Sequence, residues 1–269
     1  MGWGWFLAVD MQLFLVTPIL IFIHHKSPKI GWFLLSVWLA QDVTTAVSLV
    51  LARDYSASIL IQQGHFFSNF YQRTYVRASP YIVGIASGYI YSYLRRNKSN
   101  FSIPSILLSI GYFLAFTGMF VVVFAIYWVD SWNTFENSIY LGFSRLIWGL
   151  SIAYLIITMF LGYGGLLRSL FYARCWQPFA KLTYGAYLSH PIFMLVFYFN
   201  QWSYLFYQNI NMLYFFIGHL SCAVMFSVVA YLLVEKPFMN LEPIIIKTAF
   251  KLFYKILRKP LPSKFYEHA

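Results

Sequence analysis

The feature that most constrains this chain is a series of long apolar segments with few charged residues. Seven can be drawn: Phe6–Ile23, Ile30–Leu51, Val76–Leu94, Ile106–Trp128, Leu141–Leu161, Leu182–Phe199 and Leu213–Val234. Most of them approach or exceed the roughly 20 residues that a helix needs to cross a bilayer core. Because hydrocarbon offers the backbone no hydrogen-bond partner, apolar runs of this length predict helices. The sequence therefore predicts an all-α, polytopic membrane bundle of about seven transmembrane helices.

Composition supports the same class. Of the 269 residues, 60% are hydrophobic and only 10% are charged, which is typical of multi-pass membrane proteins. Two cysteines, Cys175 and Cys222, are too few for a disulfide framework. We expect a membrane domain over residues 1–240 and a basic tail over 241–269. No metal-ligand motif and no glycine-rich phosphate loop occurs, so we expect neither a metal nor a bound cofactor.

The net charge of +11 is distributed unevenly among the loops. Lysine and arginine follow the first, third, fifth and seventh segments, whereas the loop after the fourth carries Asp130 and Glu136 and Asn200–Asn211 is uncharged. By the positive-inside rule, this alternation places the N-terminus outside or in a lumen and the C-terminus in the cytoplasm. We expect an integral protein of the plasma membrane or endoplasmic reticulum. The charge follows one membrane face, so no nucleic-acid partner is expected.

The tail has its own pattern. Lys247, Lys251 and Lys255 recur at i+4 spacing with Lys259 next, and aromatic and apolar side chains fall largely on the opposite side. This predicts a basic amphipathic helix on an anionic lipid surface. A retention signal or a partner-binding tail is the alternative. The oligomeric state cannot be predicted from the sequence.

Several ionisable residues lie inside or at the ends of the apolar segments. They are Asp10, Asp42, Arg77, Arg145, His190, His219 and Glu235. A lone charge in hydrocarbon costs at least about 2.5–3.5 kcal/mol, so such residues pair with each other or face water. We expect a polar path or cavity that includes Asp42, Arg77, Glu235 and Tyr184. The alternative is a pair of buried Asp–Arg contacts that only fix the register of the helices.

His190 is the most unusual of these residues because Pro191 follows it within an apolar run. Pro191 has no N–H, so the carbonyl four residues earlier loses its helical partner. An imidazole at this depth is a candidate for function. The alternative is a histidine that bonds only to its own or a neighbouring helix.

Four stretches together resemble a known family. They are Trp5-Phe-Leu-Ala-Val-Asp10-Met-Gln12; Arg77-Ala-Ser-Pro-Tyr81-Ile-Val-Gly84; Gly162-Tyr-Gly-Gly165 with Leu182-Thr-Tyr-Gly-Ala-Tyr-Leu-Ser-His190-Pro191; and Glu235-Lys-Pro-Phe238 with Leu241-Glu242. In order and spacing they resemble motifs of the acyltransferase type three family, in the nose resistant to fluoxetine branch.

The resemblance implies a membrane enzyme that moves an acyl group, not an aminoacyl group, from acyl-CoA or a similar donor to a hydroxyl acceptor. It suggests His190 as base or donor, with Arg145 and Asp10 as further catalytic candidates. The family's N-terminal domain and its first helix, with an arginine and histidine motif, are not among the matched stretches. We therefore expect this chain to be a partial membrane domain. Two alternatives remain: a lipid or small-molecule transporter or binding protein, and a seven-helix receptor.

Overall fold

The structure is a computed structural model that describes residues 3–58, 66–97, 103–127, 132–203, 206 and 208–256, the last eight of these by backbone only. Within these ranges every regular element is helical, which confirms the predicted all-α class. The chain divides into two compact units, Met1–Phe171 and Tyr172–Ala269. Each unit is described by itself.

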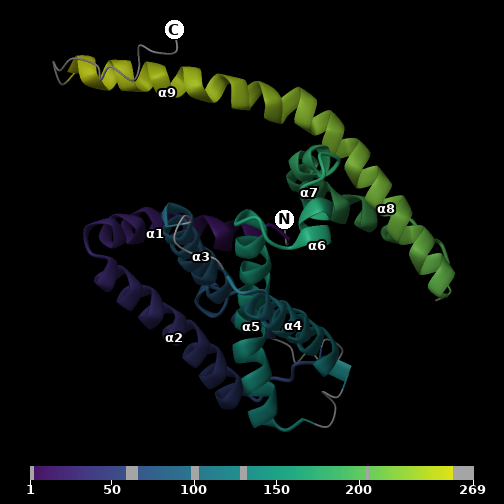
Figure 1. Cartoon of the computed structure of the whole chain (residues 1–269). Coiled ribbons are helices and arrows are strands. Elements are labelled where there is room, and N and C mark those ends of the chain that lie inside the picture. Colours follow the sequence, from purple (N-terminus) through teal and green to yellow (C-terminus); the bar gives the residue numbers. More distant parts are fainter. Residues whose placement is uncertain are drawn as a thin grey trace. The chain divides into compact units, whose positions relative to one another are not determined.

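The first unit is a helical bundle that α5 holds together. Its helices are α1 (Trp5–Lys26), α2 (Pro28–Arg53), α3 (Ser79–Arg96), α4 (Ser105–Phe124), α5 (Thr134–Phe160) and α6 (Gly165–Phe171). The long helix α5 contacts α2, α3 and α4, and α1 packs on α2 (Figure 1). Residues 66–78, here called the connector, lead into α3 through the short helical turns η1 (Phe67–Tyr71) and η2 (Thr74–Val76).

The second unit is built on an antiparallel pair of helices. It contains α7 (Trp176–Phe199), α8 (Asn209–Ala230), the π-helical turn η5 (Tyr231–Glu235) and α9 (Lys236–Ile256). The helix α7 continues through Pro191 without interruption. The helical run that begins with α8 also passes residue 240 without a break, so the predicted boundary between membrane domain and tail stays a prediction. Lys247 is half-buried on α9; the side chains of Lys251 and Lys255, and all of Lys259, lie outside the described residues.

Six helical runs among the described residues are long and apolar enough to cross a membrane, as expected of an integral membrane protein. They are Trp5–Lys26, Pro28–Arg53, Ser105–Tyr127, Thr134–Phe160, Trp176–Phe199 and Asn209–Thr248. Large apolar side chains remain exposed along them, for example Phe14, Phe113 and Phe216. Such exposure is unfavourable in water and favourable in lipid.

The third predicted span differs from the others. Its residues form α3, which has only 18 residues and carries Arg95 and Arg96 in its last turn. It is not among the helices that are apolar enough to cross a membrane by themselves. Serine, tyrosine and arginine side chains lower its hydropathy. The segment that was expected to be the third span is therefore a short, polar helix that packs against α5.

Basic side chains gather at one end of the first unit. The helix α1 ends with His25 and Lys26, and α3 ends with Arg95 and Arg96. These ends lie together because the ring of His24 stacks on Tyr89 of α3, with 3.6 Å between centroids. At the other end, the Thr134 hydroxyl donates to the carboxylate of Asp54 beside Glu136. The ends of α1 and α3 are thus basic, whereas the other end carries Asp54 and Glu136 together with Arg53, and orientation in the membrane stays a prediction.

Glycines set the turn that follows α5. Gly162 and Gly164 have φ angles of +102° and +101°, and Gly165 has +46°. L residues with a side chain rarely adopt this conformation, so the Gly-Tyr-Gly-Gly stretch is needed for the tight turn into α6.

The connector is packed rather than loose. Phe66, Phe70 and Val76 are buried in one apolar cluster with Val50 of α2 and Leu141 of α5. The connector lies between the second and third predicted spans. Its apolar side chains fold back between α2 and α5, which brings the connector against α1 and shapes the site described next.

Candidate functional site

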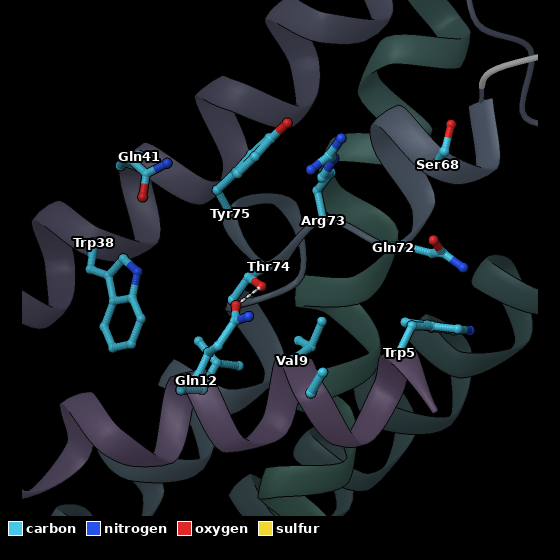
Figure 2. Close-up of a pocket in the computed structure, with 12 residues that line it drawn as sticks. Trp5, Val9, Gln12, Trp38, Gln41, Ser68, Gln72, Arg73, Thr74 and Tyr75 are labelled. Carbon is cyan, nitrogen blue, oxygen red and sulfur yellow. Dashed lines mark hydrogen bonds between the residues drawn. The ribbon is translucent and has the colours of Figure 1, made fainter. Parts of the chain in front are cut away.

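A pocket of about 630 Å³ lies between α1, α2 and the connector (Figure 2). Its lining residues are Trp5, Ala8, Val9, Gln12, Leu13, Trp38, Gln41, Ser68, Gln72, Arg73, Thr74 and Tyr75. Its volume lies within the range of small-molecule sites, about 300–1,000 Å³.

The pocket combines aromatic rings with carboxamides. Trp5 and Gln12 come from α1, Trp38 and Gln41 from α2, and Gln72 from the connector. Carboxamides both donate and accept hydrogen bonds, so they can bind hydroxyl and carbonyl groups of a ligand. The rings offer apolar area to the rest of such a molecule. The lining therefore fits a lipophilic molecule that carries one or a few neutral polar groups.

One hydrogen bond crosses the pocket and joins two of its walls. The Thr74 hydroxyl donates to the side-chain oxygen of Gln12 at 2.5 Å (Figure 2). This contact fixes the connector against α1. It uses the oxygen of the Gln12 carboxamide, so the amide nitrogen of Gln12 does not bond to Thr74. Among the described residues, Arg73 is the only cation in the lining, and its side chain is exposed.

Arg145 fixes the connector from the side opposite the pocket. Its Nη1 donates to the carbonyl of Val76. Its guanidinium also lies 5.4 Å from the centroid of the buried Phe70 ring. Arg145 therefore acts on the backbone next to the pocket and is not part of the lining.

Asp42 holds the start of α3. Its side chain is 1% exposed, and its two oxygens accept from the backbone N–H groups of Ala78 at 2.8 Å and Ser79 at 3.1 Å. The first N–H groups of a helix have no partner within the helix, and a carboxylate there also interacts favourably with the helix dipole. A carboxylate from α2 thus caps a neighbouring helix.

Arg77 links the connector to α1. Its Nε donates to the carbonyl of Tyr71 at 2.5 Å. Its guanidinium lies 4.1 Å from the Tyr71 ring centroid and 4.6 Å from that of Trp5. Since Trp5 lines the pocket, Arg77 positions an aromatic wall through a cation–π contact.

These contacts revise the expected charge pairing. No Asp–Arg ion pair forms among Asp10, Asp42, Arg77 and Arg145; Asp42 binds backbone amides and both arginines bind backbone carbonyls. Three of the predicted polar residues do meet at the connector. Asp10 is exposed on α1 and is not among the pocket residues.

The remaining predicted residues belong to the second unit. His190 is half-buried, and its Nδ1 lies 3.3 Å from the carbonyl of Ala186, one turn earlier in α7. Tyr184 is 53% exposed, and Glu235 is half-buried at the end of η5. His219 of α8 has a buried Nε2 with no hydrogen-bond partner among the described residues, beside the rings of Phe197 and Tyr198.

Close packing of α7 and α8 supports this part of the chain. The hydroxyl of Ser227 in α8 donates to the carbonyl of Leu182 at 2.6 Å. A Cβ on Gly185 would lie 2.5 Å from the Ser227 Oγ. The conformation of the stretch Leu182–Pro191 is therefore tied to a helix crossing at Gly185.

Only some of the pocket residues could have been identified from the sequence. Gln12 and Gln41 are carboxamides within apolar spans, where unpaired polar groups are costly. That cost could have marked them, whereas Trp38, Thr74 and Tyr75 have no such signal. No group of three or more His, Cys, Asp or Glu side chains that could hold a metal gathers in the part of the chain that the structure describes.

The chain is similar to two proteins of Caenorhabditis elegans. It is 24% identical over 216 residues to "Nose resistant to fluoxetine protein 6", and 24% identical over 233 residues to "Regulator of hypoxia-inducible factor 1". Each match covers 73% of this chain. No protein-family profile and no solved structure matches it. The similarity supports the resemblance to the nose resistant to fluoxetine branch, and the chain spans 26% and 41% of the lengths of these two relatives.

Proposed function

We propose that this chain is a membrane-embedded part of an acyltransferase, in which the pocket binds a lipophilic acceptor that carries a hydroxyl group. The acyl donor would be acyl-CoA or a similar thioester. The membrane would be the plasma membrane or the endoplasmic reticulum, with the N-terminus outside or lumenal. The tail would lie on an anionic cytoplasmic leaflet.

One observation carries the proposal of an acceptor site. Two stretches that resemble family motifs meet at the pocket: Trp5 and Gln12 come from the first, and Arg77 of the second holds Trp5 in place. The hydroxyl of Tyr81, in the second stretch, also lies 2.8 Å from that of Thr17, which follows the first stretch on α1. These motifs lie far apart in the sequence, so their meeting at one cavity supports a shared role.

In the proposed reaction, the acceptor oxygen attacks the thioester carbonyl, the C–S bond breaks and an ester C–O bond forms. The hydroxyl proton goes first to a base and then to the leaving thiolate. We assign the base to His190. Its Nδ1 lies 3.3 Å from the Ala186 carbonyl, so the neutral tautomer with the proton on Nδ1 would donate there and would leave Nε2 able to accept a proton. Arg145 is given a positioning role through the Val76 carbonyl.

The test is acyl transfer by the purified chain in lipid nanodiscs, with radiolabelled oleoyl-CoA and a long-chain alcohol. His190→Gln should lower the rate about 10²–10⁴-fold, as expected for loss of a general base. His25→Gln, an exposed histidine at the end of α1, is the matched control and should retain the rate. Full transfer by His190→Gln would contradict the assignment of His190 as the base.

A second candidate function is binding or transport of lipophilic compounds without chemistry. The observation that favours it is the lining, which holds three carboxamides and three aromatic side chains but none of His190, Arg145 and Asp10. One relative is named for fluoxetine, a lipophilic amine, so radiolabelled fluoxetine is a suitable probe. Saturable binding that Trp38→Ala weakens, together with no acyl transfer, would favour this second function.

A further inference from the structure

A second cavity has no lining residue in common with the pocket between α1, α2 and the connector. It is a groove of about 450 Å³ between α3 and α5. On α3 its lining includes Gly84, Ser87 and Gly88, and on α5 it includes Ile152 and Ile156. A Cβ added at Gly84 or Gly88 would meet no atom within 4 Å. These glycines therefore leave open space at the surface and do not form the close helix contact that such spacing often provides.

The groove is closed at one end and leads to arginines at the other. At the closed end, a Cβ on Gly149 would lie 3.2 Å from the Cα of Pro80, so α3 and α5 touch there. At the other end, Tyr91 lines both this groove and a separate cavity of about 410 Å³. That cavity is lined by Tyr91, Ser92, Arg95 and Arg96.

The two cavities follow one another along α3, and the first is mostly apolar whereas the second is lined by arginines. Pro80 and Tyr91 are eleven residues apart on a helix, which corresponds to roughly 16 Å at 1.5 Å per residue. Apolar side chains dominate this length, and two guanidinium groups and a hydroxyl follow it. Lys26 and Lys29 lie where α1 ends and α2 begins, at the same end of the unit as Arg95 and Arg96, so the local charge is positive.

We propose that this groove holds one acidic phospholipid of the surrounding bilayer. One acyl chain lies along α3 and α5 beside Gly84 and Gly88. The phosphate lies at Arg95 and Arg96, with the Ser92 hydroxyl as a further donor. Arginine forks match phosphate oxygens in geometry and charge.

The two arginines at one end of the groove favour an acidic lipid over other apolar occupants. A transmembrane helix on this groove would gain nothing from two arginines at its end. A lipid without phosphate would fill the apolar part but leave the arginines without an anion, and a zwitterionic phospholipid would bring its own cation close to them. The inference uses neither the acceptor pocket nor acyl transfer, so it stands or fails independently of both.

The test is native mass spectrometry of the purified chain from nanodiscs that contain phosphatidylserine and phosphatidylcholine in equal amounts. The unchanged chain should retain one phosphatidylserine. The double variant Arg95→Gln/Arg96→Gln should lower its occupancy ratio about 30-fold, since each basic side chain near a lipid surface contributes about 1 kcal/mol. Arg53→Gln, an exposed arginine at the far end of α2, is the matched control and should leave retention unchanged.

A second variant tests the apolar part. Gly84→Leu fills the groove and should abolish retention while both arginines remain. Gly218→Leu is its control, because Gly218 also has nothing within 4 Å of an added Cβ but lies on α8. If Gly84→Leu fails to fold, the arginine variant alone decides.

Equal retention of both lipids would overturn the inference, and so would retention that the arginine variant does not change. A dimer of the chain that Gly84→Leu dissociates would also overturn it and would assign the groove to a second copy. Displacement of the lipid by equimolar oleoyl-CoA would also overturn it and would make the groove an acyl-donor site.

Discussion

At the scale of single residues, the charges inside the first unit stabilise backbone and not each other. Asp42 caps α3, and Arg145 and Arg77 bond carbonyls of the connector. The sequence showed that both signs of charge occur in apolar spans, and it showed their energetic cost. It could not show that the partners are main-chain groups, because that depends on how the connector folds between α2 and α5.

Arg145→Leu tests the role of Arg145. The change removes a charged hydrogen bond to the Val76 carbonyl and the contact with Phe70, so it should lower the free energy of unfolding by about 2 kcal/mol. Unfolding in detergent, followed by tryptophan fluorescence, gives the measurement. Arg53→Leu, exposed at the end of α2, is the control and should change it by less than about 0.5 kcal/mol. Equal effects of the two changes would count against the assigned role.

Asp42→Asn distinguishes backbone capping from ion pairing. The carboxamide keeps one acceptor oxygen, so one of the two N–H bonds is lost and stability should fall by about 1 kcal/mol. In the background of Arg145→Leu, a true Asp–Arg pair would make Asp42→Asn restore stability. The structure predicts a further loss instead. Recovery of stability in the double variant would show that the ion pair matters more than the cap.

At the scale of helices, apolar runs predicted most elements well, and six of the seven predicted segments coincide with helices that can span a membrane. The remaining segment, Val76–Leu94, corresponds to α3. It was predicted as a span from its apolar stretches, but its serines, tyrosines and arginines make it too polar to cross a membrane by itself. The connector could not be predicted, because Phe66, Phe70 and Val76 show no period and are ordered only by the cluster they join.

Gly185→Ala tests the crossing of α7 and α8. The added methyl would lie 2.5 Å from the Ser227 Oγ and 3.3 Å from the Ser227 Cα, so the helices must separate and stability should fall by about 1–3 kcal/mol. Gly218→Ala is the matched control, since nothing lies within 4 Å of its added methyl. It should be neutral or slightly stabilising, because alanine favours helix. The comparison is made by thermal unfolding in nanodiscs, and similar losses for both would argue against close packing at Gly185.

At the scale of the whole molecule, the charge distribution predicts orientation. The basic end of the first unit holds Lys26 and Arg95, and the opposite end holds Asp54 and Glu136. In a background without native cysteines (Cys175→Ser, Cys222→Ser), a membrane-impermeant maleimide applied to intact cells should label Asn133→Cys and not Lys29→Cys. The reverse pattern would invert the predicted topology.

The proposed function depends most on the pocket between α1, α2 and the connector. Its carboxamides could have been suspected from the sequence, but their meeting with Trp5, Trp38 and Tyr75 required the fold. We therefore predict that a lipophilic hydroxyl compound binds at the walls of this pocket and not diffusely along the lipid-facing surface.

The most direct measurement is photocrosslinking of a diazirine-bearing long-chain alcohol to the purified chain in nanodiscs, with labelled residues mapped by mass spectrometry. We predict labels concentrated in Trp5–Leu13 and residues 66–76, competed by unlabelled alcohol and reduced at least tenfold by Trp38→Ala. Trp202→Ala, a fully exposed tryptophan of the second unit that does not line the pocket, should leave them unchanged. Labels spread evenly over the exposed apolar surface, or insensitive to Trp38→Ala, would contradict the account.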